Sequence, residues 1–256
     1  MIKFFRNIRQ RLISENRFSK YLLYAIGEIV LVVIGILIAL QINTWNEYEK
    51  MRKHETLYLN RLLKENKKDV ESFTEEIERL ENNNTTIQEL SNAFKDRTSA
   101  DTLLIRSAGN YMVFGSLYPI FNPSTSTYED LSSTGNLSLI EDTELRDLIV
   151  KHYEAYEFVE SNFKINIDWA IPIDSPLFIN TNALQFDEKF TKSLFREESN
   201  EQLARELRTN EAIFLRNAAL HYWINKDCIA YLKNIKKETT VLVSLIEEKL
   251  NRKSKT

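Results

Sequence analysis

Acidic side chains recur at helical spacing in two groups between residues 141 and 160. The groups are Glu141, Asp142, Glu144 and Asp147, and then Glu154, Glu157 and Glu160. Paired carboxylates can act as general acid and general base. Acids are equally typical of a helix N-terminus, where they oppose the helix dipole, and of a solvated helix face. We therefore interpret both groups as structural and predict no acid–base site.

The histidine and cysteine positions match no metal-binding or nucleophile pattern. His54, His152 and His221 are the 3 histidines, and none follows a Glu by three residues, as the di-metal sites of helical bundles require. The sequence contains no HExxH, Walker loop, GxGxxG or GxSxG motif. A single cysteine, Cys228, excludes an intramolecular disulfide and predicts a buried thiol in a helix. We predict no catalytic site, no metal, no cofactor and no enzymatic activity.

One long apolar stretch lies near the N-terminus, and it determines on which side of a membrane the rest of the chain lies. Residues 21–42 read YLLYAIGEIVLVVIGILIALQI, with Glu28 and Gln41 as the polar exceptions. At ~1.5 Å per helical residue the stretch spans roughly 33 Å, enough to cross a hydrocarbon core of ~30 Å. It is too long for an ordinary signal peptide. The stretch therefore predicts an uncleaved transmembrane helix in contact with the lipid bilayer.

Charge is distributed unevenly about this span. Residues 1–20 carry 6 Lys and Arg against 1 acid, whereas residues 47–256 carry 28 Lys and Arg against 35 Asp and Glu. The positive-inside rule predicts a cytoplasmic N-terminus and places the chain after Ile42 on the other side of the membrane. The basic flank either lies on the inner leaflet as an amphipathic segment or only fixes topology. The acidic domain argues against a nucleic-acid partner.

Four positions in and beside the span are candidates for membrane contacts. Glu28 lies near the middle, where a carboxylate costs ~2.5–3.5 kcal/mol. It is protonated or hydrogen-bonded to a partner helix, or it reaches towards the inner headgroups, or it belongs to an ion path. Gly35 and Ala39 are small residues four apart, which allows close helix approach. Trp45 follows at interface depth.

Residues 43–250 predict an all-α domain, an elongated helical bundle, followed by a frayed tail at 251–256. With only 5 Gly and 4 Pro in the chain, the apolar residues after the span follow a long heptad seam. The seam is Leu59, Leu63, Asn66, Val70, Phe73, Ile77, Leu80, Asn84, Ile87, Ser91 and Phe94. It pairs either with other helices of the same chain or with another copy.

The region between residues 97 and 140 is less regular. Ser99 or Asp101 caps a helix predicted over residues 102–116. A loop follows, interrupted by a short helix over residues 126–133 that ends at Gly135. Binding residues favour such connections; the alternative is turn and capping chemistry alone. The candidate binding residues are Tyr118, Asn122, Tyr128 and Asn136.

Two more long helices are predicted. The first is capped by Asp142 or Thr143 and runs to about Ala170, where Pro172 and Pro176 stop it. Its seam is Leu145, Ile149, His152, Tyr156, Val159, Phe163, Asn166 and Ala170. A loop over 171–186 and a short helix over 187–197 follow. The chain is then helical from about residue 200, with a bend near residues 209–210 and a stripe of Ile213, Leu220, Ile224, Tyr231, Ile235, Leu242 and Leu245.

The residues FFRNIRQRLISENRFSKYLLYAIGEIVLVVIGILIALQINTWNE and TYEDLSSTGNLSLIEDTELRDLIVKHYE resemble the span and central motif of an uncharacterised family of Bacteroidota membrane proteins, a domain of unknown function. The resemblance implies a single-pass inner-membrane protein with a helical external domain; the family has no assigned activity, so no catalytic residue is carried over. We therefore predict a membrane-anchored interaction or scaffold module that associates with itself or with a protein partner. The alternatives are a periplasmic ligand sensor that signals through a partner, and an accessory subunit of a transport or ion-coupling complex.

Overall fold

The computed structural model describes residues 18–253, except for the side chains of residues 18–21, 24 and 253. Most of the predicted basic flank and residues 254–256 of the predicted tail therefore lie outside the described residues. Within them the chain forms helices and no strand, which confirms the all-α prediction. It divides into two compact units, residues 1–56 and 57–256.

The first unit contains the predicted span, within helix α2 (Phe18–Lys95). Among the described residues, this is the one helix long and apolar enough to cross a membrane. Its most apolar window has a mean hydropathy of 2.6 and no buried residue. An apolar helix surface of this length that packs against no other part of the described chain suits a lipid environment. The candidate membrane helix near the N-terminus is thus present as predicted.

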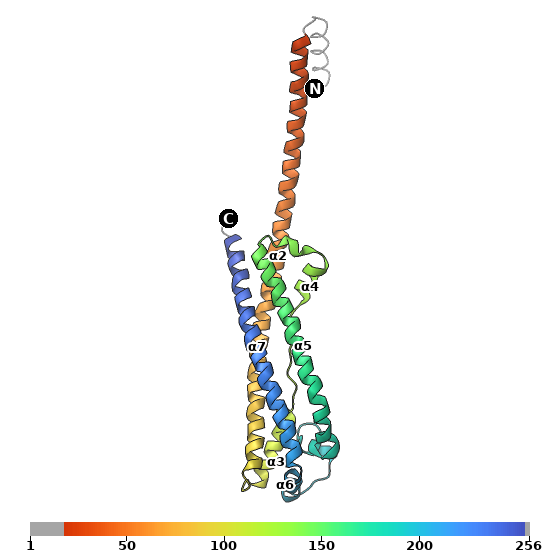
Figure 1. The fold of residues 1–256 in the computed structure, drawn as a ribbon, viewed down its shortest axis with the longest axis vertical. Helices are drawn as coiled ribbons and strands as arrows, with labels where there is room; N and C mark the ends of the chain where they lie inside the picture. The colour runs from red at the N-terminus through yellow and green to blue at the C-terminus, as the bar shows by residue number, and fades with distance from the viewer. Residues whose placement is uncertain (1–17, 254–256) are drawn as a thin grey trace. The chain divides into compact units, whose positions relative to one another are not determined.

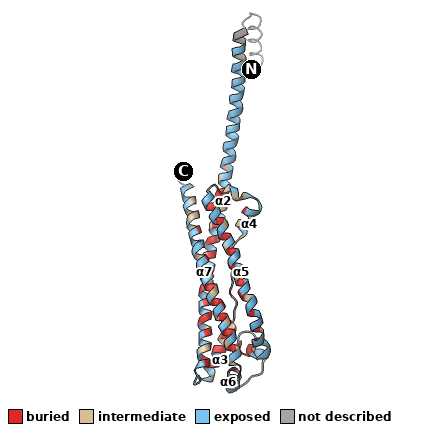
Figure 2. Ribbon diagram, viewed as in Figure 1, coloured by how far each residue is buried: buried red, intermediate tan, exposed pale blue. Residues whose placement is uncertain are grey.

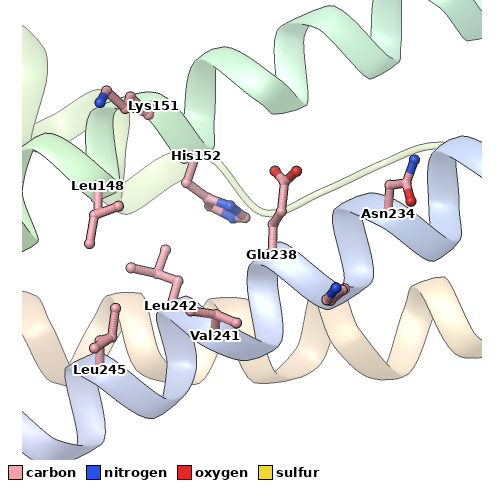
Figure 3. Close-up of a pocket in the computed structure, with 9 residues that line it drawn as sticks. Leu148, Lys151, His152, Asn234, Glu238, Val241, Leu242 and Leu245 are labelled. Atoms are coloured by element: carbon pink, nitrogen blue, oxygen red, sulfur yellow. The ribbon is translucent and has the colours of Figure 1, made fainter.

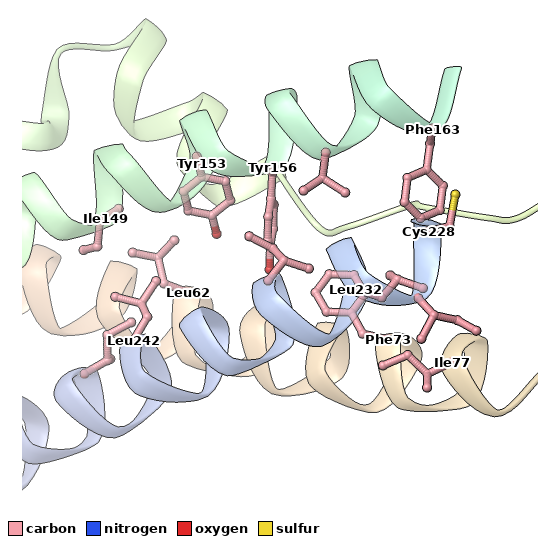
Figure 4. Packing of buried hydrophobic residues seen from close by; sticks show 14 of the residues in the cluster. Leu62, Phe73, Ile77, Ile149, Tyr153, Tyr156, Phe163, Cys228, Leu232 and Leu242 are labelled. Atoms are coloured by element: carbon pink, nitrogen blue, oxygen red, sulfur yellow. The ribbon is translucent and has the colours of Figure 1, made fainter. Parts of the chain in front are cut away.

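The second unit is built on three long helices. These are α2 from residue 57 onward, α5 (Thr143–Asn180) and α7 (Glu211–Lys253). Helices α5 and α7 lie side by side and run in opposite directions (Figure 1). Buried residues follow the inner sides of all three helices (Figure 2). Large aromatic and aliphatic side chains from each meet between them (Figure 4). Apolar burial of this kind is the main source of helix stability in a bundle.

Short elements complete the second unit. They are α3 (Asp101–Asn110), the π-helix η1 (Tyr111–Gly115), α4 (Ser126–Ser133), the 3₁₀ turns η2 (Asn136–Leu139), η3 (Ala183–Phe186) and η4 (Lys192–Leu194), and α6 (Asn200–Thr209). The predicted helix over 126–133 is confirmed, and Gly135 after it has φ 73°. That left-handed conformation suits a residue without Cβ. The predicted helix over 102–116 is α3 continued by η1.

The prediction that Pro172 and Pro176 stop the second long helix is wrong. Helix α5 passes through both prolines and ends at Asn180, so no loop begins at residue 171. Proline removes a backbone donor and leaves the carbonyl four residues earlier unpaired. Both prolines lie on the exposed side of α5, where water can reach those carbonyls. The N-terminal prediction is confirmed, since the Asp142 side chain accepts a hydrogen bond from the Leu145 N–H at 3.1 Å.

The predicted short helix over residues 187–197 is also wrong, since only the turn η4 forms there. The predicted bend near residue 209 is confirmed, because α6 ends at Thr209 and α7 begins at Glu211. Ser199 caps α6 in a capping box with Gln202, which explains where that helix starts. Helix α7 continues to Lys253, beyond the predicted boundary at residue 250.

The seam of α2 is shifted by one residue at three places. Leu62, Asp69 and Leu90 are buried, whereas the predicted Leu63, Val70 and Ser91 are only partly buried. The seam of α5 matches its prediction at all eight positions. Neighbouring leucines at 62 and 63 make the pattern of α2 ambiguous, and a buried carboxylate at 69 is not expected from apolar periodicity.

Candidate functional site

Residues 116–142, between η1 and α5, are held against α2 by hydrogen bonds to carboxylate side chains, and we call them the anchored segment. The three carboxylates are Glu65, Asp69 and Glu76. Asp69 accepts from the Ser124 backbone N–H at 3.0 Å and from its hydroxyl at 2.9 Å. Glu76 accepts from the Ile120 N–H at 2.7 Å. Charge-assisted bonds of this type are about twice as strong as neutral ones. The segment is therefore anchored along one side of the bundle.

Apolar periodicity does not identify Asp69 as an inward-facing residue, because the predicted seam places Val70 inward. Burial raises the pKa of the Asp69 carboxyl, while hydrogen bonds from Ser124 and from the Tyr156 hydroxyl oppose that effect; the net pKa lies above its usual value. Its partners come from the anchored segment and from α5. Asp69 is 2% exposed and joins α2, the anchored segment and α5.

The four candidate binding residues of this segment have different surroundings. Tyr118 donates a hydrogen bond to Asp174. Tyr128 stacks on Tyr153 with ring centroids 4.3 Å apart. Asn136 donates to the Tyr58 hydroxyl at 3.3 Å, and Asn122 is exposed. The structure does not bring the four together into one cluster. Three of them make contacts within the chain that support its packing.

A buried polar network surrounds Asp174, which lies on α5 between the two prolines. Asp174 Oδ1 accepts from Asn217 Nδ2 at 2.6 Å and lies 2.9 Å from His221 Nε2. Asn217 Oδ1 in turn accepts from the Tyr111 hydroxyl at 2.5 Å. Tyr118 completes the network through the other oxygen of Asp174. The network therefore links α5, α7, η1 and the anchored segment.

The electrostatics of Asp174 follow from its partners. Burial acts to raise the pKa of its carboxyl, but the hydrogen bonds from His221, Tyr118 and Asn217 outweigh it and the pKa lies below its usual value. An Asp–His pair can position a general base. Here His221 is fully buried, and none of the network partners is a serine or cysteine that could act as nucleophile. The described residues also hold no group of three His, Cys, Asp or Glu placed to bind a metal.

An open groove of about 450 Å³ lies along α5 and α7 (Figure 3). Leu148, Val241 and Leu245 give it apolar walls, and His152 lies between the two helices. His152 is 5% exposed and its Nε2 has no hydrogen-bond partner. Burial lowers the pKa of this imidazole to about 4. The ring is therefore neutral at physiological pH.

The low pKa of His152 predicts loss of stability in mild acid. The unfolded chain binds a proton near the ordinary histidine pKa of ~6.5, whereas the folded chain binds it only near a pKa of about 4. Between these values stability falls as pH falls, by up to ~1.4 kcal/mol per pH unit. Urea denaturation of the solubilised chain at several pH values measures this slope. His152→Gln should flatten it between pH 6.5 and 4, and equal slopes in both proteins would contradict the expectation.

Exposed apolar side chains continue from this groove along the same two helices. We call this surface the α5/α7 face and define it by Leu148, Phe158, Ile165, Trp169, Trp223 and Val241. Phe158 is 61% and Trp169 is 59% exposed. Trp169 stacks on Trp223 across the seam, with centroids 6.1 Å apart and planes 19° apart. Apolar periodicity does not predict this face, because none of its six residues belongs to a predicted seam or stripe.

The candidate positions of the span are all on an exposed helix surface. Glu28, Gly35 and Ala39 are exposed, and a Cβ at Gly35 would meet nothing within 4 Å. Trp45 is 63% exposed. Gly35, Ala39 and Trp45 therefore present a surface that lipid or another helix can contact. Cys228, by contrast, is a buried free thiol as predicted, and burial raises its pKa to about 12.

Comparison with known proteins gives a family and no characterised relative. No curated protein and no solved structure matches the chain. The sequence model of a family of unknown function, DUF6090, matches residues 28–166. These residues include most of the predicted span, the anchored segment and the first part of α5. The chain therefore belongs to the DUF6090 family of unknown function.

Proposed function

We propose that this protein is a membrane-anchored interaction module without enzymatic activity, in which the helical second unit binds protein through the α5/α7 face. The single observation that carries the proposal is the exposed aromatic and aliphatic surface of that face. Large contiguous apolar patches on a folded protein mark interaction sites. Tryptophan is also the residue type most enriched at interface hot spots.

Photocrosslinking in growing cells tests this proposal. A photoreactive phenylalanine analogue replaces Trp169 or Trp223, and a matched control replaces Phe190, which is 69% exposed but lies outside α5 and α7. We expect protein adducts at positions 169 and 223 and several-fold fewer at position 190, because only the face is held against a partner. Equal adduct yields at all three positions would exclude the face as a binding surface.

We further propose that the anchor places the second unit in the periplasm of a Bacteroidota cell, with the N-terminus in the cytoplasm. The support is the basic excess before the span and the resemblance of the span to proteins of that group. A cysteine at the exposed Ser138 should react with a membrane-impermeant maleimide added to cells with a permeabilised outer membrane. The buried Cys228 should stay unlabelled. Labelling of the new cysteine only after the inner membrane is lysed would reverse the assigned orientation.

A further inference from the structure

In the bundle of α2, α5 and α7, each pair of helices meets along one outer seam. The residues that cover or line these three seams differ. The α2/α5 seam carries the anchored segment, whose Phe121 stacks on Phe73 of α2 at 5.4 Å. The α2/α7 seam is lined by charges, including the Lys233–Glu81 ion pair at 2.8 Å. The α5/α7 seam carries the exposed aromatic face. Among the described residues of these three seams, the exposed and stacked Trp169 and Trp223 lie at the α5/α7 seam.

The two edges of the α5/α7 face carry opposite charge. On α5, Glu154 is exposed four residues before Phe158, and Asp168 is exposed three residues after Ile165, so each acid neighbours an apolar residue of the face. Lys226 and Lys237 are exposed on the outer edge of α7. Lys237 also lines the groove between α2 and α7, so it lies on the far side of α7 from α5. Between the acidic and basic edges the face is mostly apolar, with Lys151 of α5 and Glu238 of α7 in the groove at its centre. A partner that matches this face therefore presents apolar residues in the middle, with a basic edge opposite α5 and an acidic edge opposite α7.

A second copy of the same face meets this requirement. A two-fold axis parallel to the helices places α5 of one copy opposite α7 of the other and keeps every residue at its own level along the axis. The acidic edge of each copy then meets the basic edge of its partner.

The levels of the charged residues agree with this arrangement. The stacked Trp169 and Trp223 mark one level along the two antiparallel helices. Glu154 precedes Trp169 by 15 residues and Lys237 follows Trp223 by 14, which places them ~22 Å and ~21 Å along the axis in the same direction. The two-fold axis thus brings Glu154 of each copy level with Lys237 of the other.

The size of the face is also adequate. From Leu148 to Trp169 it extends for roughly 32 Å, and two packed helices present a width of roughly 20 Å. Each copy then buries on the order of 600 Å², close to the ~800 Å² per partner of a standard interface. Confinement in one membrane raises the effective concentration and lowers the affinity that is needed.

We propose that a second copy of this chain docks on the α5/α7 face about a two-fold axis parallel to α5 and α7, so that Glu154 of each copy pairs with Lys237 of its partner. This inference rests on the proposed interaction function and names its partner. The apolar centre supplies the affinity, and the charged edges select a parallel, self-complementary register.

Charge reversal in the full-length chain tests the proposal. In Glu154→Lys, two like-charged pairs face each other in every homodimer, and the same holds for Lys237→Glu. We expect each variant alone to weaken self-association in nanodiscs or mild detergent at least about tenfold. A mixture of the two variants restores both opposite-charge pairs and should form a heterodimer as tight as the wild type. Mass photometry and co-purification of two differently tagged chains measure this, and Glu71→Lys at an exposed site on α2 is the control.

The outcomes separate this inference from the proposed function. Heterodimers that exceed either homodimer support the second-copy assignment, since Glu154 and Lys237 lie on opposite edges within one chain. A wild type that stays monomeric, or single variants that associate as well as the wild type, overturns it. If photoadducts at position 169 then contain a different protein, the α5/α7 face is still a binding surface, but its partner is not a second copy of this chain. If positions 169 and 223 give no specific adduct, the proposed function fails as well.

Discussion

Replacing Asp174 by Ala is expected to lower the free energy of unfolding by ~3–5 kcal/mol. The carboxylate is 7% exposed and accepts from Asn217, His221 and Tyr118. Its removal leaves the buried Asn217 and His221 and the partly buried Tyr118 without their acceptor. Each unsatisfied group costs ~1–3 kcal/mol, and more where charge is involved. The loss is therefore far larger than that of an ordinary surface substitution.

Urea denaturation of the solubilised full-length chain, followed by circular dichroism, measures this effect. Asp168→Ala is the matched control, since Asp168 lies on the same helix but is exposed, and a change within ~0.5 kcal/mol is expected for it. Equal destabilisation by both substitutions would show that the network does not hold α5, α7 and the anchored segment together.

The second large effect concerns the register of α2. Leu62→Ala should cost ~2–5 kcal/mol, because Leu62 is fully buried and truncation leaves a cavity. Leu63 is partly buried at the edge of the same core, so Leu63→Ala should cost less than half as much. The two substitutions remove the same atoms from adjacent positions, and each serves as the control for the other. A larger loss of unfolding free energy for Leu63→Ala than for Leu62→Ala would show that Leu63 is the buried residue, as periodicity alone predicts.

Acidic residues illustrate how the candidate site departs from sequence-based expectation. The acids at 154, 157 and 160 are exposed, as a solvated face requires. The structurally decisive carboxylates are instead Asp69 and Asp174, which no motif marks. Asp69 replaces an expected apolar position, and Asp174 lies in a stretch that two prolines had assigned to a loop. Their partners are between 43 and 87 residues away in the chain, a separation that local pattern does not encode.

Local sequence pattern also does not predict the α5/α7 face. Trp169 and Trp223 each look like isolated exposed residues in the sequence. They become one surface only because α5 and α7 pack antiparallel and bring them into a stack. Apolar periodicity identifies the inner side of each helix. Whether exposed residues on the outer side form one surface depends on which helix packs beside it.

The sequence by itself determined the helical class, the apolar span and most helix boundaries. These are local properties, because hydrophobic periodicity, capping at Asp142 and the left-handed Gly135 act over a few residues. Only the tertiary structure decided the phase of the α2 seam and the passage of α5 through its prolines. It also assembled the Asp174 network and the α5/α7 face. The physical reason is that burial and water access at each position depend on neighbours distant in sequence, and they override local preference.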